Sequence, residues 1–191
     1  MDEMMLKTFQ GELATQCKLV GIGSEYLDKS LSEPGRYQGD PTAYTWAALQ
    51  NILVSAANIS KLLWGSGPAS KRAQLEAIRQ PLRESVKVSD SSILNSTRLR
   101  NDFEHFDERI EKWFGGTDKM IYMGRNIGRS DFLVVVVEGP SSSPPPSPTK
   151  FGHFDPQTGI VEFWDNSADI RAIVKAVHEL SGRLAELPEL H

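Results

Sequence analysis

One short stretch of the chain combines the residue types that proton transfer and phosphate binding need. Residues 98–113 read RLRNDFEHFDERIEKW and place Arg100, Asn101 and His105 within six positions. A histidine exchanges protons near neutral pH, and an arginine presents a rigid fork of N–H donors that fits phosphate oxygens. These three residues are therefore the candidate catalytic group of the sequence.

The elements around this group are expected to be helical. An apolar seam with steps of four, three, four and three residues predicts a helix over 91–114 and consists of Leu99, Phe103, Phe106, Ile110 and Trp113. At 100° per residue, Asn101 lies about 40° from His105 around the helix, whereas Arg100 lies about 140° away. A regular helix therefore does not bring Arg100 and His105 together within one chain.

A solvated helix face is the alternative interpretation of the same stretch. Its charged residues can form ion pairs three and four positions apart, each worth a few tenths of a kcal/mol, and they include Asp107, Glu108, Arg109, Glu111 and Lys112. Most runs of this composition have no further role.

Hydrophobic periodicity predicts five helices, with strands confined to residues 118–165. The expected helices are 3–28, 41–65, 70–86, 91–114 and 167–186. Asp40-Pro41 favours a helix start, GIG at 21–23 is expected to kink or end the first helix, and Ser70 is expected to cap the third. The outer face of the third helix is expected to be basic, with Lys71, Arg72, Arg79, Arg83 and Lys87.

The predicted fold is thus mainly α: an up-and-down helical bundle with a small antiparallel β insertion before its last helix. We expect one domain over 1–191, with the insertion at about 118–165. The insertion contains a Pro/Ser-rich loop at 139–150, which has almost no apolar side chain to bury. In DPQTG, Asp155-Pro156 and Gly159 predict the turn of a β-hairpin.

Composition excludes several classes of function. The net charge of −4 gives no overall basic footprint for nucleic acid, and the longest apolar run, FLVVVV, is too short to span a bilayer as a helix. The single cysteine, Cys17, is expected to pack in the core, and a cytoplasmic location is expected. His153 is expected on a strand surface, and no histidine shows metal-ligand spacing, so neither a metal nor another cofactor is expected.

The stretch Arg100-Asn101-Asp102-Phe103-Glu104-His105 resembles the Arg-x(4–6)-His motif of the HEPN superfamily (higher eukaryotes and prokaryotes nucleotide-binding). In that family a polar residue, often Asn, follows the arginine, as Asn101 does here. The motif also follows a buried helix of a similar style, WAALQNILVSAANISKLLW. The resemblance covers roughly residues 3–114 and the last helix, whereas the sheet and the Pro-rich loop look like an insertion.

This resemblance implies a metal-independent endoribonuclease, such as a toxin or defence effector, that works as a homodimer. The Arg100 of one chain would then meet the His105 of the other, with Asn101 orienting the histidine or binding a phosphate oxygen. Arg98 and Arg109 are expected to contact the RNA, and an antitoxin or sensor protein is an expected partner. The alternative is a non-catalytic HEPN-like module that binds a protein partner or a nucleotide. A helical bundle with a coincidental motif is a third interpretation.

Overall fold

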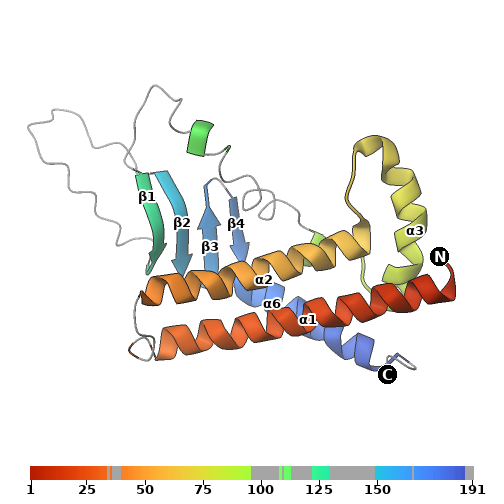
Figure 1. Cartoon of the computed structure of the whole chain (residues 1–191), viewed down its shortest axis with the longest axis horizontal. Helices are drawn as coiled ribbons and strands as arrows, with labels where there is room; N and C mark the ends of the chain where they lie inside the picture. The colour runs from red at the N-terminus through yellow and green to blue at the C-terminus, as the bar shows by residue number, and fades with distance from the viewer. Residues whose placement is uncertain are drawn as a thin grey trace, which may run out of the picture. The chain divides into compact units, whose positions relative to one another are not determined.

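The architecture is mainly helical, with a four-stranded sheet before the last helix, as the sequence predicts (Figure 1). The computed structural model describes residues 1–33, 35, 40–95, 108, 110–112, 122–129, 149–164 and 166–187. Within these ranges, no helix has the length and the apolar composition that crossing a membrane requires.

The first helix, α1 (Glu3–Ser32), runs beyond its predicted end at residue 28. It begins where the Asp2 side chain accepts a hydrogen bond from the Met5 N–H at 2.7 Å. The predicted break at GIG is wrong, because Gly23 lies inside the helix at a close contact with α2. A Cβ atom on Gly23 would lie 2.8 Å from Ile52 Cγ1. The absence of a side chain here thus permits the approach of two helices.

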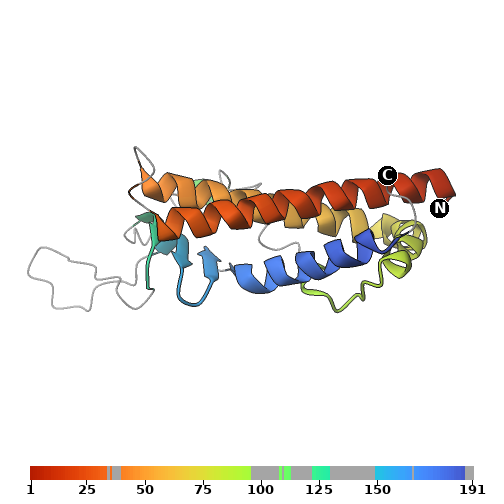
Figure 2. The same cartoon turned by 90° about the horizontal axis from the view of Figure 1, so that it is seen from below.

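The second helix, α2 (Pro41–Trp64), matches its predicted range almost residue for residue. Asp40 caps its start, and Gly65, at φ 80°, ends it. The helix lies alongside α1 in both views, running in the opposite direction (Figures 1 and 2). Their shared interior is apolar and is built mainly by Leu13, Cys17, Val20, Leu27, Leu49, Ile52, Ala56, Ile59 and Leu63.

The third helix, α3 (Arg72–Ser85), follows the 3-10 turn η2 (Ala69–Lys71). The predicted cap at Ser70 is wrong, because the residue before the helix is Lys71, which makes no capping bond with its side chain. Pro81 does not stop the helix, which continues to Ser85 and is followed, after Val86, by the left-handed residue Lys87 at φ 51°.

The helix predicted over 91–114 does not begin at 91. Ser91 lies in a turn, and η3 (Ile93–Asn95) is a single 3-10 turn with Leu94 buried. The serines here make local bonds typical of turns: the hydroxyls of Ser89 and Ser91 bond each other at 2.8 Å, and Ser92 Oγ accepts from the Leu94 N–H at 3.3 Å. Residues 108 and 110–112 are helical.

The sheet has the order β1-β2-β3-β4 and contains β1 (Tyr122–Ile127), β2 (Thr149–Asp155), β3 (Ile160–Phe163) and β4 (Asn166–Asp169). The hairpin β2–β3 is confirmed, with Gly159 at φ 77° and its N–H donating to the Asp155 carbonyl at 2.8 Å. The prediction of an entirely antiparallel sheet is wrong for one pair, because β1 and β2 are parallel. A connection of about 20 residues joins them, which is long enough for the crossover that parallel strands need.

The last helix, α6 (Ile170–Ala185), begins three residues after its predicted start, because residues 166–169 form β4. Its buried apolar stripe consists of Ile170, Ile173, Val177, Leu180 and Leu184.

The chain divides into two compact units, Met1–Thr97 with Arg171–His191, and Arg98–Ile170. The predicted β insertion at about 118–165 belongs to the second unit, and the single domain over 1–191 stays a prediction. Most of the Pro/Ser-rich loop at 139–150 lies outside the described residues, and its last two residues begin β2.

Candidate functional site

The candidate catalytic group of the sequence lies outside the residues that the structure describes. This holds for Arg100, Asn101 and His105, and also for Arg98 and Arg109, the residues predicted to contact nucleic acid. Of the apolar seam around them, only Ile110 is described, and it is half-buried in the helical stretch 110–112. The geometry of this group therefore stays a prediction.

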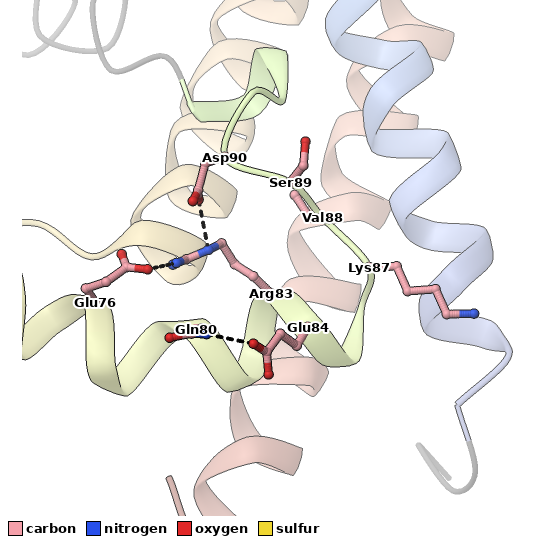
Figure 3. A pocket seen from close by; sticks show the side chains of 8 residues that line it. All are labelled: Glu76, Gln80, Arg83, Glu84, Lys87, Val88, Ser89 and Asp90. Carbon is pink, nitrogen blue, oxygen red and sulfur yellow. Dashed lines mark hydrogen bonds and ion pairs between the residues drawn. The ribbon is translucent and has the colours of Figure 1, made fainter.

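Within the described residues, α3 carries a charged cluster that was not predicted from the sequence (Figure 3). Its centre is Arg83, whose side chain is only 5% exposed. The guanidinium donates from Nη1 to the Leu63 carbonyl at 2.8 Å, from Nη2 to the Glu76 carboxylate, and from Nε to Asp90 Oδ1 at 3.1 Å. We call Arg83, Glu76, Asp90 and Trp64 the Arg83 cluster.

Trp64 completes the cluster from the end of α2. Its indole Nε1 donates to Asp90 Oδ1 at 2.8 Å, and its ring centroid lies 5.9 Å from the Arg83 guanidinium carbon. One carboxylate oxygen of Asp90 thus accepts from both side chains. The cluster joins α2, α3 and the turn after α3 through hydrogen bonds whose donors have fixed directions.

An open pocket of about 540 Å³ lies beside the Arg83 cluster. Its polar groups are largely bonded to one another: Gln80 donates to Glu84 at 2.8 Å, and Glu76 and Asp90 bind Arg83. Lys87 also lines the pocket, but its side chain points away from Arg83 (Figure 3). This arrangement leaves few polar groups for a ligand, so we assign the cluster a structural role.

The predicted basic face of α3 is wrong for two of its arginines. Arg83 is buried in the cluster, and Arg79 is half-buried with its guanidinium carbon 3.9 Å from the centroid of the Phe9 ring. In the part of the chain that the structure describes, Nε and Nη1 of Arg79 have no hydrogen-bond acceptor. Burial lowers the pKa of Arg79, because the charged form loses hydration.

His153 is also placed differently from its prediction. It is only 2% exposed and belongs to the interior of the sheet, not to its surface. Its register partners are Asn126 on β1 and Glu162 on β3, so an amide, an imidazole and a carboxylate form one row. Directly opposed residues lie close enough to interact, and the DPQTG turn would have predicted the pair of His153 and Glu162. At this burial the imidazole is out of reach of a substrate.

Cys17 packs between α1 and α2, as the sequence predicts, and is 5% exposed. Desolvation by burial raises the pKa of its thiol to about 12. The thiolate, which is the nucleophilic form, is therefore negligible at neutral pH.

Two further results bear on the possible chemistry. Among the described residues, no group of three His, Cys, Asp or Glu side chains is placed to hold a metal ion.

Comparisons of the chain with protein-family models, with curated proteins and with solved structures found no match. The resemblance to the HEPN superfamily therefore rests on the sequence alone.

Proposed function

We propose that this protein is a HEPN-like, metal-independent endoribonuclease. The observation that carries the proposal is the spacing of Arg100, Asn101 and His105 in a segment that follows two long paired helices. The mainly helical fold is consistent with it, and residues 110–112, five positions beyond His105, are helical. We expect the protein to act in the cytoplasm.

The proposed reaction uses the nucleophile that RNA itself carries. One proton must leave the 2′-hydroxyl as its oxygen attacks the adjacent phosphorus, and one proton must reach the departing 5′-oxygen. His105 is suited to this proton transfer, because an unperturbed imidazole titrates near neutral pH. Arg100 is suited to stabilise the negative charge that develops on the phosphate oxygens. Asn101 would orient His105 or bind a phosphate oxygen.

We propose that the active form is a homodimer. Arg100 and His105 diverge by about 140° on a regular helix, so a composite site needs the arginine of one chain and the histidine of another. A toxin or defence role, controlled by an antitoxin or sensor protein, is the biological setting that we propose. Sedimentation at tens of micromolar tests the dimer, and a monomer alone would contradict it.

The decisive experiment compares His105→Ala and Arg100→Ala with the wild type on total cellular RNA. We expect each variant to lose roughly 10²- to 10⁴-fold in rate, and Asn101→Ala to lose less. Cleavage should persist in EDTA, leave a 2′,3′-cyclic phosphate and spare DNA of the same sequence. Lys112→Ala is the matched control, since Lys112 is exposed and lies in the helical stretch after the motif.

Thermal melting of the same samples separates the alternatives. If His105→Ala melts like the wild type and neither protein cuts RNA, a non-catalytic module that binds a protein or a nucleotide is the better interpretation. If His105→Ala unfolds, the histidine is structural and the motif match is a coincidence.

A further inference from the structure

One side of α1 carries an uncharged stripe, which we call the α1 stripe. Its residues recur in steps of four, three, four, four, three and four, and they are Met4, Thr8, Gly11, Thr15, Leu19, Ile22 and Tyr26. The pattern repeats after eleven residues, or about three helical turns, so the stripe runs straight along the helix. It lies about 80° around the helix from Gln16, Gly23 and Ser30, which face α2.

The large apolar side chains of the α1 stripe are open to solvent. The exposed fraction is 81% for Met4, 47% for Ile22 and 56% for Tyr26. Single apolar residues on a surface are ordinary, but an aligned set without an intervening charge is typical of a contact surface. Thr8 and Thr15 donate their hydroxyl protons to carbonyls of their own helix at 2.9 and 3.1 Å, so a partner could cover them without leaving these donors unsatisfied.

Gly11, in the middle of the α1 stripe, is not required by packing within the described residues. A Cβ atom on Gly11 would meet no atom of this part of the chain within 4 Å, whereas one on Gly23 would clash with α2. Glycine weakens the interior of a helix relative to alanine, because it loses more backbone freedom on folding. A second surface that approaches α1 closely from outside would account for a glycine at this position.

A second copy of α1, running in the opposite direction, fits the α1 stripe in size. If Thr15 of one copy lies opposite Thr15 of the other, the remaining positions of the stripe face each other in reverse order. The facing pairs are Met4 with Tyr26, Thr8 with Ile22 and Gly11 with Leu19. The smaller side chains of one half thus meet the larger side chains of the other half, which allows facing residues to interdigitate.

The charges beside the α1 stripe fit the same arrangement. Lys7 and Glu25 are exposed on one flank, about 80° from the centre of the stripe. A two-fold axis places this flank beside the same flank of the other copy, where Lys7 comes within about two residues of Glu25, and symmetry repeats the pair. Lys7 also binds Glu3 of its own helix at 3.1 Å, but its ammonium group has donors for a second carboxylate. Lys18 comes beside Ala14 and meets no like charge there.

We propose that the α1 stripe is the contact surface of a homodimer in which the α1 helices of two copies pack antiparallel. The stripe supplies the apolar contact. The pairs of Lys7 with Glu25 set direction and register, because exposed ion pairs contribute little affinity by themselves. The proposed function requires a homodimer but names no surface among the described residues. This inference therefore goes beyond it, and it does not depend on RNA cleavage.

Sedimentation of the full chain tests the surface with two matched glycine variants. Gly11→Glu places a carboxylate in the α1 stripe, whereas Gly21→Glu makes the same change on the same helix about 120° from the centre of the stripe. In the described part of the chain, a Cβ on either glycine meets no atom within 4 Å, so both variants should fold.

We expect the wild type to be mainly dimeric at tens of micromolar. Gly11→Glu should raise the dissociation constant at least roughly 30-fold, because the dimer would bury an unpaired charge. Gly21→Glu should change it by less than about threefold, since its carboxylate stays in water.

An exchange of charges tests the antiparallel direction. Lys7→Glu and Glu25→Lys should each raise the dissociation constant by roughly 3- to 10-fold, because each replaces two attractive pairs with two repulsive ones. The double variant Lys7→Glu/Glu25→Lys again has opposite charges across the contact. Its dissociation constant should return to within about twofold of the wild-type value.

The outcomes separate this inference from the proposed function. A wild type that is only monomeric at tens of micromolar would overturn the inference. A dimer that responds equally to Gly11→Glu and Gly21→Glu would also overturn it, and would leave the homodimer of the proposed function to another surface. A double charge variant that associates no better than the single variants would exclude the antiparallel pairing.

A dimer that dissociates in Gly11→Glu but not in Gly21→Glu supports the inference even if the wild type cleaves no RNA, a result that would end the ribonuclease proposal alone. If Gly11→Glu does not fold, the charge variants supply the decision, because they change exposed residues.

Discussion

The contact between α1 and α2 and the attachment of α3 differ in the forces that hold them. Between α1 and α2 the interior is mainly apolar, and Thr45 of α2 donates to Ser30 Oγ of α1 at 3.0 Å within it. The end of α3 is instead fastened through the buried charge of Arg83. The difference shows that apolar burial sets the distance between helices here, whereas directed hydrogen bonds set the path of the chain after α3.

The largest loss of stability is expected from a cavity between α1 and α2. Leu49 is completely buried on the α2 face. Leu49→Ala should lower the free energy of unfolding by roughly 2–5 kcal/mol, because it removes apolar contacts and leaves a void. Urea denaturation measures this, and Val54→Ala, at an exposed position of the same helix, is the control. A loss below that of the control would show that this interior is not tightly packed.

Overpacking the same contact should have the next largest effect. Gly23→Ala places a methyl group 2.8 Å from Ile52 Cγ1 and 2.9 Å from Asn51 Oδ1, so these side chains or one of the helices must shift. We expect a loss of roughly 1–3 kcal/mol in the free energy of unfolding. Gly21→Ala is the control, because a Cβ there meets no atom within 4 Å and alanine favours a helix. If both variants are more stable than the wild type, α1 and α2 do not approach each other as closely at Gly23 as the structure shows.

The two arginines of α3 allow a direct test of the role of charge. Arg83→Ala should lower the free energy of unfolding by about 1–3 kcal/mol, because it removes the bonds of a buried side chain and also the space that this side chain fills. Arg79→Ala should change it by less than about 1 kcal/mol, since Arg79 is half-buried and the lost contact with Phe9 is offset by relief of buried, unbonded N–H groups. Thermal melting of both variants measures these losses. Equal losses at positions 83 and 79 would contradict a stabilising role for the hydrogen bonds of Arg83.

The smallest expected effect concerns pH and Cys17. Its thiol pKa is raised to about 12 in the folded protein, above a value near 9 when exposed. Below pH 9 both states hold the proton, so stability is complete there. Above pH 9 only the unfolded state loses the proton, and stability falls by about 1.4 kcal/mol per pH unit until the folded thiol ionises. Between pH 8 and 10 the wild type should lose about 1 kcal/mol more than Cys17→Ala, measured by urea denaturation.

The sequence predicts those parts of the fold that depend on local patterns. Asp40, Pro41 and Gly65 give α2 its ends, and Gly159 gives the hairpin its turn, because caps and turns involve residues that are neighbours in the chain. The parallel pairing of β1 with β2 depends on strands that are far apart in sequence, so no local pattern contains it. The helix through GIG was missed because glycine at 21 and 23 favours a break, whereas packing against α2 favours continuity.

For the candidate site too, local spacing could be predicted from the sequence, whereas the arrangement in space could not. The positions of Arg100 and His105 follow from a spacing in the sequence, but their arrangement does not. Glu76 and Arg83, seven residues apart, lie on one helix face and were predictable as a pair. The contribution of Asp90 and Trp64 was not, because it depends on how the chain turns after α3. Periodicity assigned Arg83 to the outer face, but three acceptors compensate for its burial.

The division of the first unit into two sequence segments has a consequence for protein synthesis. The α1–α2 pair is complete once residue 64 has been made, but α6 follows only after about 70 residues of the other unit. At roughly 5–20 residues per second, the ribosome needs several seconds to bridge that interval. During this time the nascent chain lacks Arg183, which binds the Lys87 carbonyl, and the apolar stripe of α6. The unfinished unit is therefore a natural substrate for chaperones that bind exposed apolar surface.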